Sequence, residues 1–226
     1  MPPLFARLKS RAAATTVTVS ALALLATTAC VPPLEPDPDT AGGGNGNGNA
    51  SKLLGELTVA DARPMKGYSR NKFSHWRSTG KNCDVRDTVL ERDGKNIELS
   101  GCNVVGGTWV SVYDNKTLSE PLQVDIDHMV PLANAWRSGA DEWNDKDRSD
   151  FANDLDRPQL FAVSASSNRS KGDQDPSQWK PANREYWCQY AGDWVAVKHH
   201  WKLSVTAAEK TALTGMLEDC TWTSAP

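Results

Sequence analysis

The stretch Asp125-Ile126-Asp127-His128-Met129-Val130-Pro131-Leu132 carries the clearest structural signal in the chain. Apolar and acidic residues alternate through 122–127, which predicts a strand with one apolar face and one acidic face. A short helix is expected over 132–138, because Pro131 favours the first turn of a helix and Gly139 its end. The strand therefore delivers an acidic side chain and a histidine together at its end.

A second strand and a helix are expected further along the chain. Residues 160–163 have the pattern of a short buried strand. Ser164 is a suitable N-cap for a helix that ends at Gly172, and this helix contains Asn168-Arg169-Ser170-Lys171. We expect the two strands and the helix to form a hairpin-plus-helix unit that brings the Asp-His pair close to this helix.

The sequence around this unit is mostly helical in pattern. Apolar spacing predicts a helix over 51–61, and a helical turn is expected over 148–153. Two C-terminal helices are expected over 183–202 and 206–217, while a β-branched and aromatic run predicts a strand over 104–113. The predicted fold class is therefore α+β, with the hairpin-plus-helix core embedded in a mostly helical domain.

The first 50 residues differ in composition from the rest of the chain. A positively charged start and a short apolar run predict a signal peptide over 1–30, because the run is too short for a permanent bilayer span. Residues 31–50 are rich in proline, glycine and asparagine and have little to bury, so we expect a flexible tether. The remaining residues, 51–226, suit one domain of ordinary size.

The end of the leader, Thr27-Thr28-Ala29-Cys30, resembles a bacterial lipoprotein cleavage box. We therefore expect Cys30 to be lipidated and the protein to be exported, either lipid-anchored at the cell surface or secreted. The N-terminal lipid would be its only membrane contact. The alternative is an unpaired thiol in a discarded leader. Nothing in the sequence indicates an obligate protein partner.

Four cysteines remain for the domain, and an oxidising compartment would allow them to form disulfides. Pairing neighbours in sequence predicts the bridges Cys83–Cys102 and Cys188–Cys220. Four cysteines permit three connectivities, so the sequence alone leaves all three open. Each bridge would stabilise the domain by about 3 kcal/mol through the entropy of the unfolded chain.

The net charge argues against a broad nucleic-acid-binding surface. The chain carries a formal charge of −3, and loss of Arg7, Lys9 and Arg11 with the leader takes it to −6. A protein that holds DNA mainly by counterion release is usually basic. An enzyme that binds its substrate transiently needs only a local basic site. The net charge therefore argues against a nucleic-acid partner without excluding one.

The residue types in the hairpin-plus-helix unit suit metal-assisted hydrolysis. His128, neutral near pH 7, can accept a proton from an attacking water. Asp127 and Asn168 offer a carboxylate and an amide oxygen, which favour one hard divalent ion, Mg²⁺ or Mn²⁺. Arg169 and Lys171, on the same helix, can hold phosphate. Each signal is weak alone, since an Asp-His pair is usually a surface salt bridge or a turn.

Three motifs taken together, 125–136, 151–154 and 167–173, resemble the HNH (ββα-metal) endonucleases in order and spacing. The closest resemblance is to the secreted bacterial branch related to the nuclease part of GmrSD-type restriction enzymes, and it extends from about Tyr68 to Cys220. It implies a nucleic-acid substrate and an active site at the end of the first strand.

The resemblance also implies a role for each site residue. His128 would be the general base, Asp127 and Asn168 the metal ligands, and Asn153 the middle asparagine that braces the active-site loop. One departure is the link from Asn153 to Leu160, which is longer than the Asn-Asp-Pro-x-Asn-Leu link of that branch and leaves the start of the second strand open.

The sequence therefore predicts an exported, metal-dependent endonuclease. We expect DNA as the substrate and little base specificity, because phosphate contacts carry no sequence information directly. The alternative is a noncatalytic surface lipoprotein that binds cell-wall or nucleic-acid polymer. His75-Trp76 is interpreted as packing and His199-His200 as helix surface, while Asp125 is a candidate for assisting the metal indirectly.

Overall fold

The structure is a computed structural model that describes residues 45–220. The predicted leader, Cys30 and most of the expected tether lie outside the described residues. Within 45–220, no helix is both long and apolar enough to cross a membrane. This part of the chain combines helices with antiparallel strand pairs, which agrees with the predicted α+β class.

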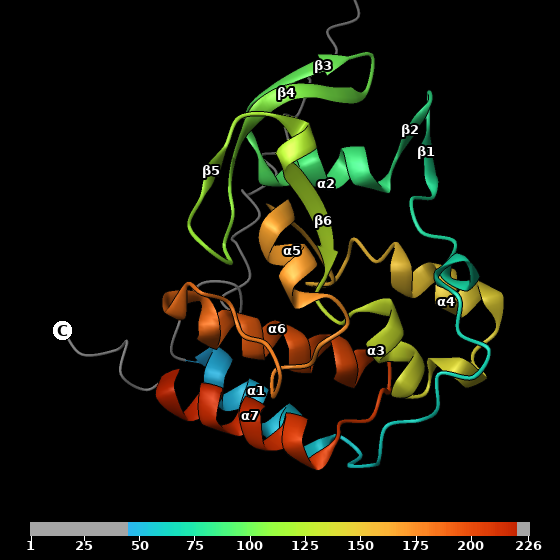
Figure 1. Ribbon diagram of the computed structural model, residues 1–226, viewed down its shortest axis with the longest axis vertical. Coiled ribbons are helices and arrows are strands. Elements are labelled where there is room, and N and C mark those ends of the chain that lie inside the picture. The colour runs from blue at the N-terminus through green and yellow to red at the C-terminus, as the bar shows by residue number, and fades with distance from the viewer. Residues whose placement is uncertain (1–44, 221–226) are drawn as a thin grey trace, which may run out of the picture. The chain divides into compact units, whose positions relative to one another are not determined.

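Strands β6 (Val124–His128) and β7 (Leu160–Ser164) form an antiparallel pair (Figure 1). Val124 lies opposite Ser164, and His128 lies opposite Leu160. The first strand begins two residues later than predicted and extends to His128. The second strand begins at Leu160, as predicted, despite the longer link that precedes it.

Helix α5 (Ala165–Lys171) follows β7 directly and packs against both strands. The Ser164 hydroxyl accepts a hydrogen bond from the backbone N–H of Ser167, and Gly172 follows the helix with φ +56°. Both ends of the helix therefore agree with the prediction. Serine is favoured at the start because its side chain caps the helix, and glycine is favoured at the end because it adopts a left-handed backbone without strain.

The apolar face of the strand pair packs against α2 (Val85–Asp93). Strands β4 (Asn103–Val110) and β5 (Thr117–Leu118) complete this smaller core. Its buried members are Val85, Val89, Leu90, Val104, Trp109, Leu118, Val124, Ile126, Leu160 and Ala162. The alternation of side chains along β6 then leaves Asp125 and Asp127 on the opposite face, towards α5.

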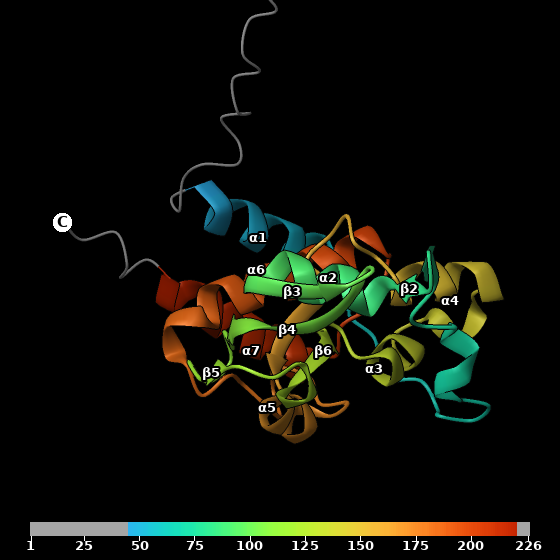
Figure 2. The same cartoon turned by 90° about the horizontal axis from the view of Figure 1, so that it is seen from above.

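A larger core lies among the helices. In both views α1 (Asn45–Glu56) lies beside α6 (Trp187–His200) and α7 (Ala207–Glu218) (Figure 1 and Figure 2). Helices α3 (Leu132–Arg137) and α4 (Asp145–Ala152) belong to the long connection between β6 and β7. The other elements are the strands β1 (Ser78–Gly80), β2 (Cys83–Asp84) and β3 (Lys95–Ser100), and the 3₁₀ turns Arg70–Phe73, Pro121–Gln123, Ala140–Glu142 and Arg184–Tyr186.

Several boundaries differ from the prediction. Helix α1 begins at Asn45 and not at 51, so residues 45–50 of the expected tether are helical. The reason is tertiary, because Ala50 is buried in the helical core. Strand β4 ends at Val110, three residues before the predicted end, and α4 begins at Asp145, where the Asn144 side chain caps it.

Both disulfides form the predicted pairs. Cys83–Cys102 links β2 to the turn between β3 and β4, and Cys188–Cys220 links the first turn of α6 to the end of α7. Each closes a loop of ordinary length, with sequence separations of 19 and 32 residues. The first bridge therefore joins two segments beside the smaller core, and the second joins two helices of the larger core.

A buried carboxyl on α6 makes the stability of the domain depend on pH. Burial raises the pKa of Asp193 to about 7, although Gln189 and Tyr186 donate hydrogen bonds to it. The folded state therefore holds this proton between about pH 4 and pH 7, where the unfolded chain has lost it. The stabilisation that this bound proton gives the folded state is fully present below about pH 4. It is lost as the pH rises from 4 through 7.

We predict that Asp193→Asn is more stable than the wild type at pH 8 by up to about 4 kcal/mol, at 1.36 kcal/mol for each pKa unit. An asparagine carries no charge; its amide oxygen can accept from Gln189, and its NH2 group can donate to the Tyr186 hydroxyl in place of accepting from it. At pH 4 the two proteins should unfold at the same urea concentration. The exposed Asp61→Asn is the matched control, and an equal gain there would contradict the assignment to Asp193.

Candidate active site

His128 ends β6 with its side chain buried, at 4 % exposure. Its Nε2 lies 2.9 Å from the carbonyl oxygen of Ala152, at the end of α4. A carbonyl only accepts, so Nε2 carries the proton and Nδ1 keeps its lone pair. Burial lowers the pKa of His128 to about 3, so the ring is neutral at neutral pH. The geometry thus leaves one imidazole nitrogen as a potential base.

Asp127 precedes the histidine and is also buried, at 4 % exposure. Its Oδ2 accepts hydrogen bonds from the hydroxyl of Tyr113 at 2.6 Å and from Nζ of Lys171 at 2.5 Å. Burial raises the pKa of Asp127, and the charge of Lys171 opposes that rise. Every hydrogen bond to this carboxylate from the described residues falls on Oδ2, which leaves Oδ1 for a ligand.

Lys171 is fully buried, which corrects the expectation that it holds phosphate. Its ammonium already makes three bonds, to Asp127 Oδ2 and to the backbone carbonyls of His128 and Met129 at 2.8 and 2.9 Å. An ammonium has three donors, so none remains for a substrate. Lys171 instead holds the end of β6 in place and balances the charge of Asp127.

Asn168 and Arg169 lie on the same turn of α5 and both face Asp125. The amide nitrogen of Asn168 donates to Asp125 Oδ2 at 3.2 Å, and Nε of Arg169 lies 3.6 Å from the same oxygen. Because the amide nitrogen is held by Asp125, the amide oxygen of Asn168 is free to face a ligand. The Arg169 side chain is 75 % exposed, so it remains accessible to phosphate.

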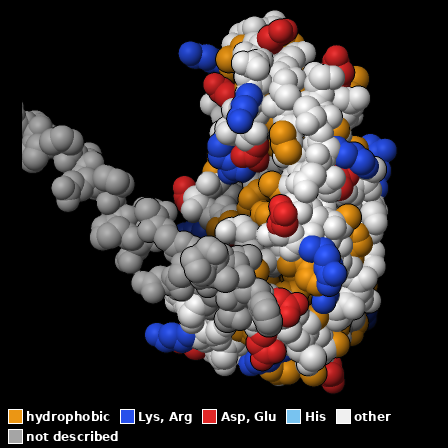
Figure 3. Space-filling model, turned by 90° about the vertical axis from the view of Figure 1, so that its left-hand side faces the viewer, with side chains coloured by type: hydrophobic (Ala, Val, Ile, Leu, Met, Phe, Trp, Pro, Cys, Tyr) orange, Lys and Arg blue, Asp and Glu red, His pale blue; other side chains and the backbone are white. Residues whose placement is uncertain are grey.

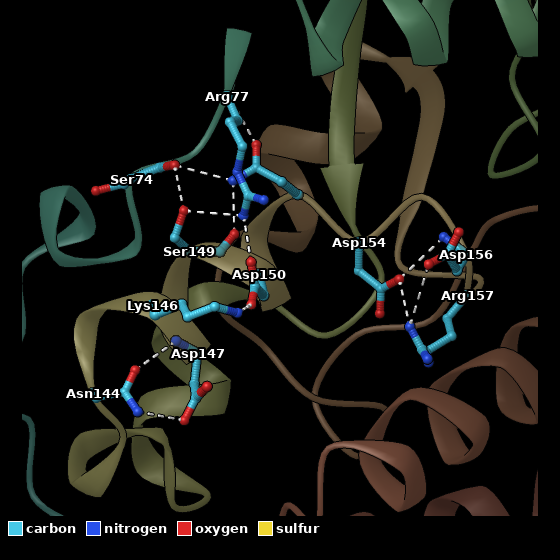
Figure 4. Close-up of polar contacts among 11 residues, drawn as sticks. Ser74, Arg77, Asn144, Lys146, Asp147, Ser149, Asp150, Asp154, Asp156 and Arg157 are labelled. Carbon is cyan, nitrogen blue, oxygen red and sulfur yellow. Dashed lines mark hydrogen bonds and ion pairs between the residues drawn. The ribbon is translucent and has the colours of Figure 1, made fainter. Parts of the chain in front are cut away.

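Asn153 follows α4 and binds the segment 74–77. Its side chain donates to the carbonyl oxygen of Ser74 at 3.0 Å and accepts from the backbone N–H of Arg77 at 2.8 Å. The Ser149 hydroxyl also donates to Ser74, and the Arg77 guanidinium pairs with Asp150 (Figure 4). Asn153 thus ties α4 to a loop that lies against the histidine.

That loop contributes Trp76, whose ring lies 5.7 Å from the His128 ring, centroid to centroid. Sequence reasoning assigned Trp76 to packing and missed this contact. It also missed Tyr113 as the hydrogen-bond donor to Asp127. Both residues lie outside the motif that ends β6, and no local pattern in the sequence places them at the site. His199 binds Glu56 on α1, as fits a helix-surface histidine.

The oxygen donors at this site fit a hard divalent ion. The free Oδ1 of Asp127 and the amide oxygen of Asn168 are the ligand types that Mg²⁺ and Mn²⁺ prefer, with water and phosphate completing the shell. No group of three or more His, Cys, Asp and Glu side chains within 45–220 is arranged to hold a metal by itself. An ion held by these two oxygens alone would keep open positions for water and phosphate.

The molecular surface carries no continuous basic band on the face that Figure 3 shows. Lysine and arginine side chains lie there among aspartate and glutamate side chains. This distribution agrees with the negative net charge.

A neutral histidine beside oxygen donors, on paired strands backed by a helix, has the chemistry of a metal-assisted hydrolytic site. Residues 85–216 match the family described as GmrSD restriction endonucleases, C-terminal domain, and the chain belongs to this family. The family supports a nuclease-type function and a nucleic-acid substrate. All four of His128, Asp127, Asn153 and Asn168 fall inside the matched residues.

A similar protein is known from the fungus Arthroderma benhamiae, where it is described as an uncharacterized secreted protein. The two chains are 51 % identical over 172 residues, which cover 76 % of this chain and 84 % of the fungal protein. No solved structure matches this chain. Assignment to the HNH class and to a bacterial branch stays a prediction.

Proposed function

We propose that this protein is an exported endonuclease that hydrolyses phosphodiester bonds of nucleic acid with one divalent metal ion and a histidine general base. DNA is the expected substrate, with little sequence specificity. The proposal rests above all on His128, whose Nε2 is held by the Ala152 carbonyl while Nδ1 is left as a base. The nuclease-type family supports it.

In this mechanism His128 accepts the proton of a water molecule that attacks the phosphorus atom. An anionic phosphate bound beside the ring raises its pKa from the low value of the free protein, which brings the base closer to the working pH. Trp76 packs beside the ring, with 5.7 Å between the two ring centroids. The Ala152 carbonyl keeps the ring in the required tautomer.

Asp127 and Asn168 would hold the metal ion, Mg²⁺ or Mn²⁺. When bound, the ion stabilises negative charge on the phosphoryl and leaving oxygens. Lys171 and Tyr113 orient the Asp127 carboxylate through Oδ2, and Asp125 orients the Asn168 amide. Arg169, exposed at the edge of the site, supplies a positive charge for a neighbouring phosphate.

Export of this chain is supported by the two disulfides, because such bridges persist in oxidising compartments. The fungal relative is described as secreted. Lipidation of Cys30 stays a separate proposal. Recovery of the mature protein from membranes, and its release by Cys30→Ser, would support it, and an unmodified soluble start would reject it.

We predict that the purified protein cuts plasmid DNA with Mg²⁺ or Mn²⁺ and that a chelator abolishes the cutting. Readdition of the metal should restore it. A panel of double-stranded DNA, single-stranded DNA and RNA then defines the substrate. Binding of polymer without any cleavage under these conditions would favour the noncatalytic polymer-binding lipoprotein and contradict the nuclease.

A further inference from the structure

The segment 69–77 lies against the catalytic histidine but belongs to neither strand nor α5. It begins with the 3₁₀ turn Arg70–Phe73. Phe73 anchors this turn, because it is fully buried and packs on Phe151 at 6.2 Å and on Trp136 at 6.5 Å between ring centroids. The position of Arg70 is therefore fixed by the helical core and is not that of a free loop.

The backbone of this segment is strained. Ser74 has φ +36° and Trp76 has φ +62°, in the left-handed region that bulky residues rarely adopt. The Asn153 side chain holds the chain in this conformation, because it donates a hydrogen bond to the carbonyl of Ser74 and accepts one from the backbone N–H of Arg77. Strain that is maintained by surrounding contacts tends to occur where a loop serves a function.

Two side chains of the segment each have a polar group without a hydrogen-bond or ion-pair partner within the described residues. His75 has a buried Nδ1 without a hydrogen-bond partner in 45–220, and its ring packs on Trp76 at 5.3 Å. Arg70 is exposed and makes no ion pair with another described residue. The turn that carries Arg70 packs against α4, and Trp76 of the same segment lies 5.7 Å from the His128 ring between centroids.

An exposed guanidinium without a carboxylate partner, beside a site for phosphoryl chemistry, is suited to bind an anion. Its planar fork matches two phosphate oxygens, and it cannot act as a base because it keeps its proton. Lys171, which the sequence predicted to bind phosphate, is buried, and its ammonium already makes three hydrogen bonds. The segment that contacts His128 thus carries a cation that pairs with no carboxylate among residues 45–220.

We propose that Arg70, held by the segment 69–77, binds a backbone phosphate of the nucleic-acid substrate next to the bond that is cut. This inference rests on the proposed nuclease function and adds a substrate-binding residue that lies before the family-matched residues 85–216. Arg70 and Arg169 would then approach the strand from two different elements, the 3₁₀ turn and α5.

The test measures binding of a duplex oligonucleotide at several salt concentrations, with all variants made in the His128→Ala background so that the DNA stays intact. Arg70→Gln should weaken binding by about 10- to 100-fold, the usual effect of a hydrogen bond to a charged group. The slope of log affinity against log salt should fall by about 0.9, which corresponds to one phosphate contact. Arg70→Lys should keep the slope and recover part of the affinity.

Lys72→Gln is the matched control. It removes one positive charge from the same turn. The Lys72 ammonium, however, lies 5.0 Å from the centre of the Trp136 ring, and we do not propose that it binds phosphate. Its salt slope should stay at the parent value. Thermal unfolding of each variant checks that the segment remains folded, and Arg70→Lys keeps the test valid if Arg70→Gln unfolds.

The outcomes separate the two proposals. A parent protein that binds no nucleic acid would overturn both the proposed function and the role of Arg70. Binding by the parent with an unchanged affinity and slope in Arg70→Gln would overturn the role of Arg70 alone. An equal loss of slope in Lys72→Gln would also overturn it, because the effect would then be one of general surface charge.

Discussion

His128→Ala is expected to lower the rate of DNA cleavage by about 10²–10⁴-fold or more, the usual contribution of a general base. The substitution removes the nitrogen that would accept the proton of water but leaves Asp127 and Asn168 in place. Metal and DNA binding should therefore persist. The measurement is a single-turnover cleavage rate with saturating Mg²⁺, because it separates chemistry from binding.

The ring of His128 also fills space under Trp76, so a loss of activity alone could reflect a damaged site. His128→Gln keeps much of the volume and a hydrogen-bond donor for the Ala152 carbonyl and should be as inactive as His128→Ala. Added imidazole should restore part of the rate in the alanine variant. His199→Ala, on the helix surface, is the control and should retain full activity. Cleavage by His128→Ala at the wild-type rate would show that the base is wrongly assigned.

Lys171→Met is expected to destabilise the domain by about 3–5 kcal/mol, the usual cost of leaving one partner of a buried ion pair alone. Lys171 is fully buried, and its ammonium lies 2.5 Å from a carboxylate that is also buried. Without the lysine, Asp127 must either stay charged in an apolar setting or take up a proton. Two carbonyl groups, of His128 and Met129, also lose their donor.

Urea unfolding of a double-mutant cycle tests this assignment. The double variant Asp127→Asn with Lys171→Met removes both charges, so it should lose less stability than Lys171→Met alone. Lys52→Met, which removes an exposed lysine that forms no ion pair with another described residue, is the control and should change stability little. If Lys171 bound phosphate, Lys171→Met would weaken substrate binding and leave unfolding unchanged, which is the opposite result.

The comparison of Arg169 with Lys171 shows how far local reasoning reaches. Both were expected to hold phosphate because both lie on α5 beside Asn168. A helix turns by 100° per residue, so Lys171, three residues after Asn168, lies on the same face and points to β6. Arg169 lies one residue after Asn168, and its side chain stays 75 % exposed although its Nε lies 3.6 Å from Asp125 Oδ2. Helical periodicity contained this difference, but only the packing of α5 against β6 showed which face is inside.

The disulfides illustrate a different limit. The composition predicted two bridges, and pairing by proximity along the chain chose the observed connectivity from three possibilities. The choice is decided by where β2 and the turn after β3 meet, and where α6 and α7 meet. These are contacts between elements, so no pattern within either element specifies them.

By itself, the sequence determined the parts of this protein whose physics is local. Alternation along β6, the cap at Ser164 and the left-handed Gly172 depend on a few adjacent residues, so the strand pair, the helix and the order of His128, Asp127, Asn153 and Asn168 could be predicted. Tertiary structure alone decided what surrounds them. Tyr113 and Trp76 reach the site from segments remote in sequence because the packing of the two cores brings them there, and burial places Lys171 as an internal counter-ion of Asp127, where the sequence predicted a phosphate-binding residue.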